Sequence, residues 1–116
     1  MVDSVNPYDR AHELARAIKD SDIFRSYIAA RDEIAEKPEY KERVFKLREK
    51  QIEINRAQVL GEEPTPQLMQ ELTLEFAKLN QHQEIASFFE AEARFIQMFN
   101  DVHEIIQKSI KDELGD

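Results

Sequence analysis

The chain has 116 residues, of which 34% are charged, and its formal net charge is −8 at pH 7. It contains no cysteine, which excludes disulfides, thiolate metal ligands, cysteine-held iron–sulfur clusters and thiol catalysis within this chain. Two glycines and four prolines among abundant Glu, Lys, Arg, Ala and Leu are typical of a helical protein. This length corresponds to one modest core, so we expect a single all-helical domain over residues 1–116.

The charge is distributed unevenly along the chain. Residues 1–60 hold 12 Lys and Arg against 12 Asp and Glu, whereas residues 61–116 hold 4 against 12. The acidic second half repels phosphates and the first half has no net positive charge, so we expect no direct binding of nucleic acid. Oppositely charged pairs at helical spacing in the first half indicate solvated helix faces. They are Glu33 with Lys37, Glu39 with Arg43, and Glu42 with Lys46.

The N-terminal sequence gives no sign of export. Met1-Val2-Asp3-Ser4 lacks the basic stretch and the following apolar core of a targeting peptide. No window of the sequence reaches the apolar length that spans a bilayer. We therefore expect a cytoplasmic protein without a membrane partner.

Capping residues and prolines divide the chain into about five helices. Asn6-Pro7 is a good helix start, since Asn caps free amides and Pro at the first helical position loses no hydrogen bond. Ser21-Asp22 supplies a second cap, and Lys37-Pro38 ends that helix. A third helix begins near Glu39 and ends at Gly61, which suits the left-handed position after a helix.

The fourth helix begins at Thr65, a capping residue, with Pro66 in its first turn. Residues 80–83 are polar but include no Gly or Pro, so they leave open whether the fourth and fifth helices are continuous. Apolar rows mark the packing faces of the third and fourth helices. They are Tyr40, Val44, Leu47 and Ile54 with Phe45, Ile52 and Val59 beside them, and then Leu68, Leu72, Phe76 and Leu79.

A long amphipathic helix is predicted from Ile85 to Leu114, where apolar residues recur at helical spacing without Gly or Pro. Its length would be about 45 Å, whereas a compact monomer of this size has a diameter of roughly 35 Å. The apolar stripe therefore needs more cover than one chain supplies, which predicts a homodimer. The candidate core or interface residues on this helix are Ile85, Phe88, Glu92, Phe95, Phe99, Val102 and Ile106.

Glu92 is the polar exception in that stripe. It lies between aromatic residues on a row where a core-facing residue is expected to be apolar, and a carboxylate there requires a partner. The interpretation we favour is an arginine partner that fixes the register of the helices. A specific ion pair with a ligand or partner protein is the alternative.

No catalytic, cofactor-binding or metal-binding set is predicted. The three histidines, His12, His82 and His103, have no second histidine at helical spacing. The sequence from His103 approaches the zinc-protease pattern, but Gln107 stands where the second ligand is required. Two glycines in the whole chain exclude a glycine-rich phosphate loop. We therefore expect a protein that is not an enzyme.

Two stretches of the sequence resemble the YlbF/YmcA family of bacterial regulatory proteins, and together they cover nearly the whole chain. The first consists of Asn6-Pro7-Tyr8-Asp9, Ala11, Leu14-Ala15, Ala17-Ile18, Ser21, Phe24 and Ala30. The second consists of Gln58-Val59-Leu60-Gly61, Leu79-Asn80, Ile85, Phe88, Ala91-Glu92, Phe95, Met98 and Val102. The resemblance is nearest to the YheA branch, whose members have no assigned biochemical activity.

The resemblance implies an all-α, dimeric, cytosolic protein of low-GC Gram-positive bacteria. Relatives act in development, competence and biofilm control, and two of them join a third protein in a complex that influences an RNA-cleaving enzyme and is linked to iron–sulfur clusters. This chain has no cysteine, so the cluster is not carried over. The preferred hypothesis is a non-enzymatic homodimeric adaptor or regulator with a protein partner. The alternatives are an accessory factor of an RNA-processing nuclease complex and, more remotely, an enzyme or small-molecule binder.

Overall fold

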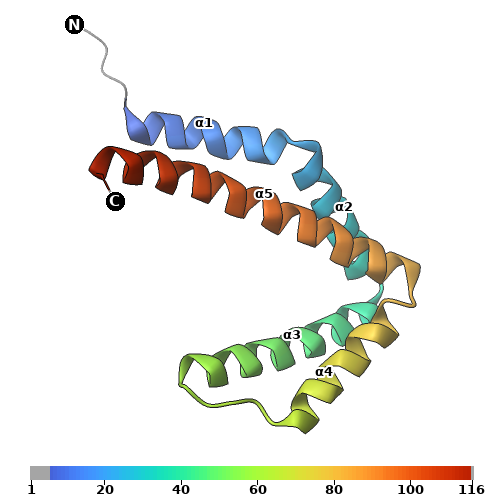
Figure 1. The fold of residues 1–116 in the computed structure, drawn as a ribbon. Coiled ribbons are helices and arrows are strands. Elements are labelled where there is room, and N and C mark those ends of the chain that lie inside the picture. Colours follow the sequence, from blue (N-terminus) through green and yellow to red (C-terminus); the bar gives the residue numbers. More distant parts are fainter. Residues whose placement is uncertain (1–5, 116) are drawn as a thin grey trace, which may run out of the picture. The chain divides into compact units, whose positions relative to one another are not determined.

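The computed structural model describes residues 6–115, which form five helices and no strand (Figure 1). The helices are α1 (Pro7–Asp20), α2 (Asp22–Ala35), α3 (Pro38–Val59), α4 (Pro66–Leu79) and α5 (Gln83–Leu114). The predicted all-α fold with a long final helix is confirmed. The expectation about Met1-Val2-Asp3-Ser4 falls on residues outside the described range.

Local capping chemistry sets most of the helix ends, as predicted. Asn6, Ser21 and Thr65 each accept a hydrogen bond from an amide in the first turn of the next helix, at 2.9, 3.1 and 3.1 Å. A proline is the first residue of α1, α3 and α4, where its missing amide hydrogen costs nothing. These caps satisfy backbone groups that a helix end otherwise leaves without a partner.

Gly61 ends α3 in the left-handed conformation, with φ of 79°. Its amide donates to the Gln58 carbonyl at 3.1 Å, and the Glu62 amide donates to the Ala57 carbonyl at 2.8 Å. This pair of bonds is the Schellman arrangement, which satisfies the last carbonyls of a helix. A side chain at Gly61 would meet no neighbouring atom, so the backbone conformation alone favours glycine there.

The structure separates α4 from α5, which settles the question left open by the sequence. The Asn80 side chain donates to the Phe76 carbonyl at 3.2 Å, and the His82 amide donates to the Leu79 carbonyl at 3.1 Å. These local bonds replace the helical pattern over residues 80–82. α5 then continues without a break for 32 residues, about 48 Å at 1.5 Å per residue.

The chain divides into two compact units. Among the described residues, unit 1 comprises 6–29 and 91–115, and unit 2 comprises 30–90. α2 and α5 therefore each contribute to both units. The assignment of residues 1–116 to one domain stays a prediction.

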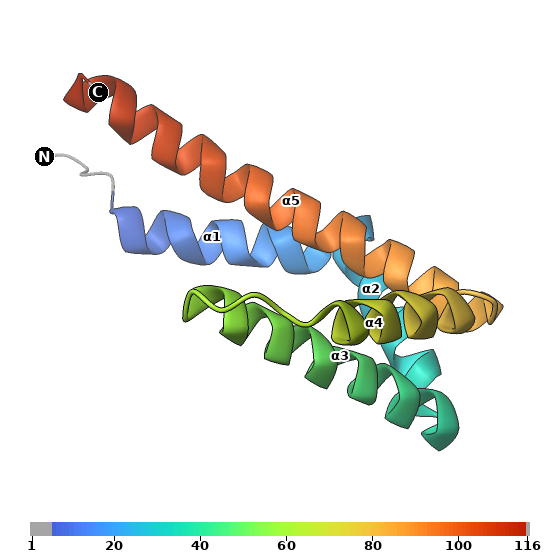
Figure 2. The same cartoon turned by 60° about the horizontal axis from the view of Figure 1, so that its bottom comes forward.

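Unit 2 is built on the α3–α4 hairpin, whose two helices lie side by side and run in opposite directions (Figures 1 and 2). Leu47, Leu79 and Ile85 are 1%, 0% and 0% exposed. Removing such a side chain from water stabilises a fold by about 1.5–3 kcal/mol. The other buried apolar residues of unit 2 are Ile34, Val44, Ile54 and Phe88.

Unit 1 has a thinner interior, centred on Phe95. The ring of Tyr27 stacks on Phe95 with centroids 5.2 Å apart, and Phe24 meets it edge-on at 5.5 Å. α1 runs alongside this part of α5 in the opposite direction (Figures 1 and 2), yet only Ile18 of its residues is even half-buried. None of the described residues of unit 1 is fully buried.

Candidate functional site

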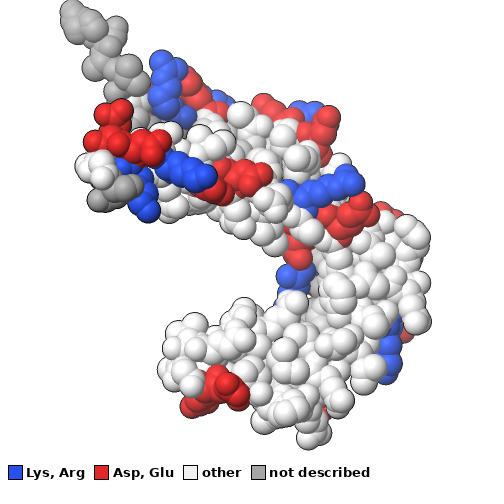
Figure 3. Space-filling view, viewed as in Figure 1, with Lys and Arg blue, Asp and Glu red and all other residues white. Residues whose placement is uncertain are grey.

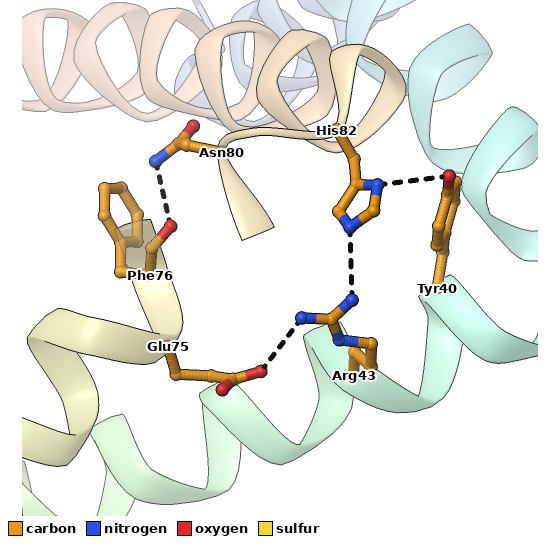
Figure 4. Close-up of polar contacts among 6 residues, drawn as sticks. All are labelled: Tyr40, Arg43, Glu75, Phe76, Asn80 and His82. Atoms are coloured by element: carbon orange, nitrogen blue, oxygen red, sulfur yellow. Dashed lines mark hydrogen bonds and ion pairs between the residues drawn. The ribbon is translucent and has the colours of Figure 1, made fainter. Parts of the chain in front are cut away.

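A polar cluster joins the α4–α5 connection to α3 within unit 2 (Figure 4). α3 supplies Tyr40 and Arg43, α4 supplies Glu75, and His82 lies in the connection itself. The His82 Nδ1 atom lies 3.3 Å from the Tyr40 hydroxyl, and Nε2 lies 3.2 Å from an Arg43 guanidinium nitrogen. Arg43 also pairs with the Glu75 carboxylate at 3.5 Å. We call these four residues the His82 cluster.

The chemistry of Arg43 determines which nitrogen of His82 carries the proton. A guanidinium only donates hydrogen bonds, so Nε2 of His82 must accept and is unprotonated. Nδ1 then carries the hydrogen and donates to the Tyr40 hydroxyl oxygen. The tautomer is thus assigned from the hydrogen-bond partners, and the charge of Arg43 is offset by Glu75.

A second contact, between Lys37 and Glu84, lies next to the cluster. The Lys37 ammonium donates to the Glu84 carboxylate and lies 5.3 Å from the centre of the Tyr40 ring. The hydrogen bond to Glu84 raises the pKa of Lys37, although desolvation opposes this shift. The other Glu84 oxygen, Oε2, is buried without a hydrogen-bond partner.

These contacts correct the expectation that the charged pairs of residues 1–60 lie on solvated helix faces. The predicted Glu42–Lys46 pair is present at 3.5 Å. Lys37, however, pairs with Glu84, and Arg43 pairs with Glu75. Partners from distant parts of the chain are brought within reach by the packing of α3 against α4 and the start of α5, which helical spacing does not reveal.

The geometry of the His82 cluster favours a structural role, in which it attaches the α4–α5 connection to α3, over a catalytic role. Both ring nitrogens of His82 are engaged, so it acts as a general base only if one contact breaks. Across residues 6–115, no group of three or more His, Asp or Glu side chains is placed to hold a metal ion. No helix in that range combines the length with the apolar run needed to cross a bilayer.

Sequence reasoning set His82 aside as one of three scattered histidines and did not find this cluster. Its partners are 39 and 42 residues away along the chain, so helical spacing carries no signal for it. The polar residues 80–83 indicate the position of the α4–α5 connection, but they do not predict that it contacts α3.

The seven candidate core or interface residues fall into three classes of burial. Ile85 and Phe88 are buried in unit 2, and the other five belong to unit 1. Glu92, Phe95 and Val102 are half-buried, whereas Phe99 and Ile106 are 43% and 46% exposed. An arginine partner for Glu92 and a subunit interface on this helix stay predictions.

The outer half of α5 carries an exposed apolar face. At 100° per residue, its members lie within one side of the helix, and the His103 ring contacts Phe99 edge-on at 4.9 Å. Contiguous exposed apolar surface of this kind marks interaction sites. We call this set the α5 face: Ile96, Phe99, Ile106, Ile110 and Leu114.

Fold and site together define a small all-helical protein with an exposed apolar helix face and, within residues 6–115, no group of three or more His, Asp or Glu placed to hold a metal ion. Residues 8–111 match the family described as "Control of competence regulator ComK, YlbF/YmcA". The chain belongs to this family, which confirms the resemblance noted in the sequence.

Relatives of known sequence agree with this membership, and one solved structure agrees with the fold. A UPF0342 protein of Symbiobacterium thermophilum is 32% identical over 107 residues, which is 92% of this chain and 96% of the relative. Another, from Alkalihalophilus pseudofirmus, is 30% identical over 110 residues, 95% and 93% of the two chains. The solved structure described as "Protein of Unknown Function (DUF964) from Bacillus stearothermophilus" has the same fold, with a TM-score of 0.81, 18% identity and coverage of 90% and 92%. These relatives are uncharacterised proteins.

Proposed function

We propose that this protein is a non-enzymatic, cytosolic, homodimeric regulator that acts by binding other proteins. The observation that carries the proposal is the contrast in burial between the two units. Unit 1 buries no side chain fully among its described residues, although it contains the aromatic centre of the long helix. A second copy covering unit 1 supplies the missing apolar contacts.

The α5 face is the surface that such a copy would cover. Its five side chains are between 43% and 71% exposed, and they continue the stripe that is buried at the other end of the same helix. Burying apolar surface stabilises association by about 25 cal/mol per Å² before the cost of lost freedom. The regulatory part of the proposal is supported by the family description, which concerns control of the competence regulator ComK.

Sedimentation velocity at micromolar concentration tests the proposal. The expected mass is twice the 13.7 kDa of one chain. The double variant Phe99→Asp/Ile106→Asp places two charges on the α5 face and should sediment as a helical monomer, because a desolvated unpaired charge is costly. The matched control is Ile105→Asp, which lies on the same helix about 120° from Phe99 and is 66% exposed.

The control should remain a dimer. A wild-type protein that sediments as a monomer contradicts the homodimer. Equal dissociation of the Ile105 variant would place the interface elsewhere and contradict the role given to the α5 face.

A further inference from the structure

A second surface lies on unit 2, on the side of α4 that faces away from α3. Pro66, Met69, Gln70, Thr73 and Leu74 line an open groove of about 530 Å³ there. They recur at helical spacing, so one face of α4 forms the groove while Leu68, Leu72 and Leu79 face inward. We call it the α4 groove.

The groove is apolar although two of its lining residues are polar. The Thr73 hydroxyl donates back to the Met69 carbonyl at 3.0 Å, so its polar atom is already engaged. Met69 and Leu74 remain 42% and 61% exposed. Methionine adapts to differently shaped apolar partners, which suits a docking surface.

Acidic residues border one end of the α4 groove. An adjoining hollow shares Met69 and is lined also by Glu62, Glu63 and Pro64. Within residues 6–115 neither of these carboxylates pairs with a cationic side chain. The Schellman bonds at Gly61 hold the backbone of Glu62 in place, and Glu63 follows it directly.

The surface view shows where charged residues lie on this part of unit 2. On the face drawn in Figure 3, the free end of the α3–α4 hairpin is uncharged except for one acidic cluster at the connecting loop. At the end of α3 and just beyond it, the apolar residues Val59 and Leu60 are 86% and 67% exposed.

We propose that the α4 groove docks an amphipathic segment of a partner protein that carries Lys or Arg beside its apolar side chains. The apolar floor supplies buried area, and the unpaired Glu62 and Glu63 select a basic neighbour and disfavour an acidic one. The groove spans about 12 Å along α4, which accommodates two turns of a bound helix. This inference rests on the proposed action through protein contacts, but it uses a surface separate from the α5 face.

The test uses two short synthetic amphipathic helices as probes, one of Leu and Lys and one of Leu and Glu, with fluorescence anisotropy at physiological salt. The wild-type protein should bind the Leu/Lys helix at least about tenfold more tightly than the Leu/Glu helix. Met69→Ser/Leu74→Ser removes the apolar floor and should weaken binding of the Leu/Lys helix by about tenfold or more. Glu62→Lys/Glu63→Lys should reverse the preference between the two probes.

The matched control is Glu71→Lys/Glu113→Lys, which changes the net charge equally at exposed carboxylates outside the groove. It should keep the preference for the Leu/Lys helix. If the control reverses the preference as well, the attraction comes from the overall charge and the proposal is wrong. It is equally wrong if Met69→Ser/Leu74→Ser binds like the wild type.

Sedimentation of the same samples separates this inference from the proposed function. The groove variants should keep the mass of the wild-type protein, since they do not touch the α5 face. A groove variant that changes the oligomeric state would assign the groove to a second copy and overturn the docking proposal. A monomeric wild-type protein that still binds the Leu/Lys helix through the groove would refute the homodimer alone.

Discussion

Units 1 and 2 are built from the same kind of amphipathic helix, but they differ in what their apolar faces meet. In unit 2, the end of α2, α3, α4 and the start of α5 together supply all seven buried apolar side chains found within residues 6–115. In unit 1, α1 and the first part of α2 lie against the rest of α5, and the described residues include no fully buried side chain. The apolar stripe of α5 is thus buried at the start of the helix, in unit 2, and partly exposed along the rest of the helix, in unit 1.

The contrast shows that the burial of one apolar stripe changes along the length of its helix. The first turns of α5 place Ile85 and Phe88 in the core of unit 2, at 0% and 6% exposure. Farther along the same stripe, Phe99 and Ile106 are almost half exposed. Buried and exposed members of an apolar stripe have the same spacing, so only the structure separates them.

The largest difference between the units should appear when a single leucine is shortened. Leu47→Ala in unit 2 removes a side chain that is 1% exposed, and the resulting cavity should lower the free energy of unfolding by about 2–5 kcal/mol. Leu14→Ala in unit 1 removes one that is 37% exposed and should cost less than about 1 kcal/mol. Urea denaturation measures both. Similar costs at the two sites would remove the distinction between the units.

Phe95→Ala tests whether the aromatic contacts of unit 1 are complete within one chain. The sequence pattern alone predicts a loss of about 3–5 kcal/mol, as for a core aromatic. Phe95 is only half-buried but contacts the rings of Phe24, Tyr27 and Phe99, so within one chain we expect about 2 kcal/mol. Thermal melts of both proteins over a range of concentrations should show a larger loss of stability for Phe95→Ala at concentrations where the wild-type protein is dimeric. A loss of stability that does not change with protein concentration would show that Phe95 stabilises only contacts within its own chain.

His82→Phe tests how unit 2 holds the α4–α5 connection. The change keeps a ring but removes two hydrogen bonds and leaves Arg43 and Tyr40 each without one partner, which should cost about 1–2 kcal/mol. His12→Phe, on the exposed α1, is the control and should be nearly neutral. Chemical denaturation followed by circular dichroism measures both variants, and an unaffected His82 variant would show that the cluster does not fasten the connection.

The smallest expected effect is the pH dependence of the Lys37–Glu84 pair. The pKa of Lys37 is raised in the folded protein, so its stabilising contribution is complete below the unfolded value of 10.5 and is lost as the pH rises through the folded pKa. Glu84→Gln removes the cause of the shift. The difference in unfolding free energy between wild type and this variant should therefore shrink above about pH 10.5, and a constant difference would contradict the assignment.

The features of this fold that were predictable from sequence are those set by neighbouring residues. The capping roles of Asn6 and Thr65 and the left-handed Gly61 depend on contacts within a few positions, and each is present as predicted. The helical period also identified Leu47 and Leu79 as core residues. Local chemistry alone determines such features, so one sequence suffices to find them.

The features that escaped prediction depend on which helices meet. Helical spacing assigned Lys37 to Glu33 and Arg43 to Glu39, whereas packing brings Glu84 and Glu75 to them. Phe45 was placed beside the packing row of α3, yet it is 61% exposed, because the buried Val44 and Leu47 lie toward the other side of the helix. Such outcomes depend on tertiary contacts between residues far apart in the chain.

Amide hydrogen exchange as a function of protein concentration tests whether unit 1 depends on a second copy, since it reports the stability of each unit separately. Unit 2 encloses its own core, so the amides of α3 and α4 should be protected equally at all concentrations. The amides of α1 and of α5 beyond residue 91 should gain protection as the concentration rises and a second copy covers unit 1. Strong protection of unit 1 that does not change with concentration would show that one chain suffices to stabilise it, and would contradict the account.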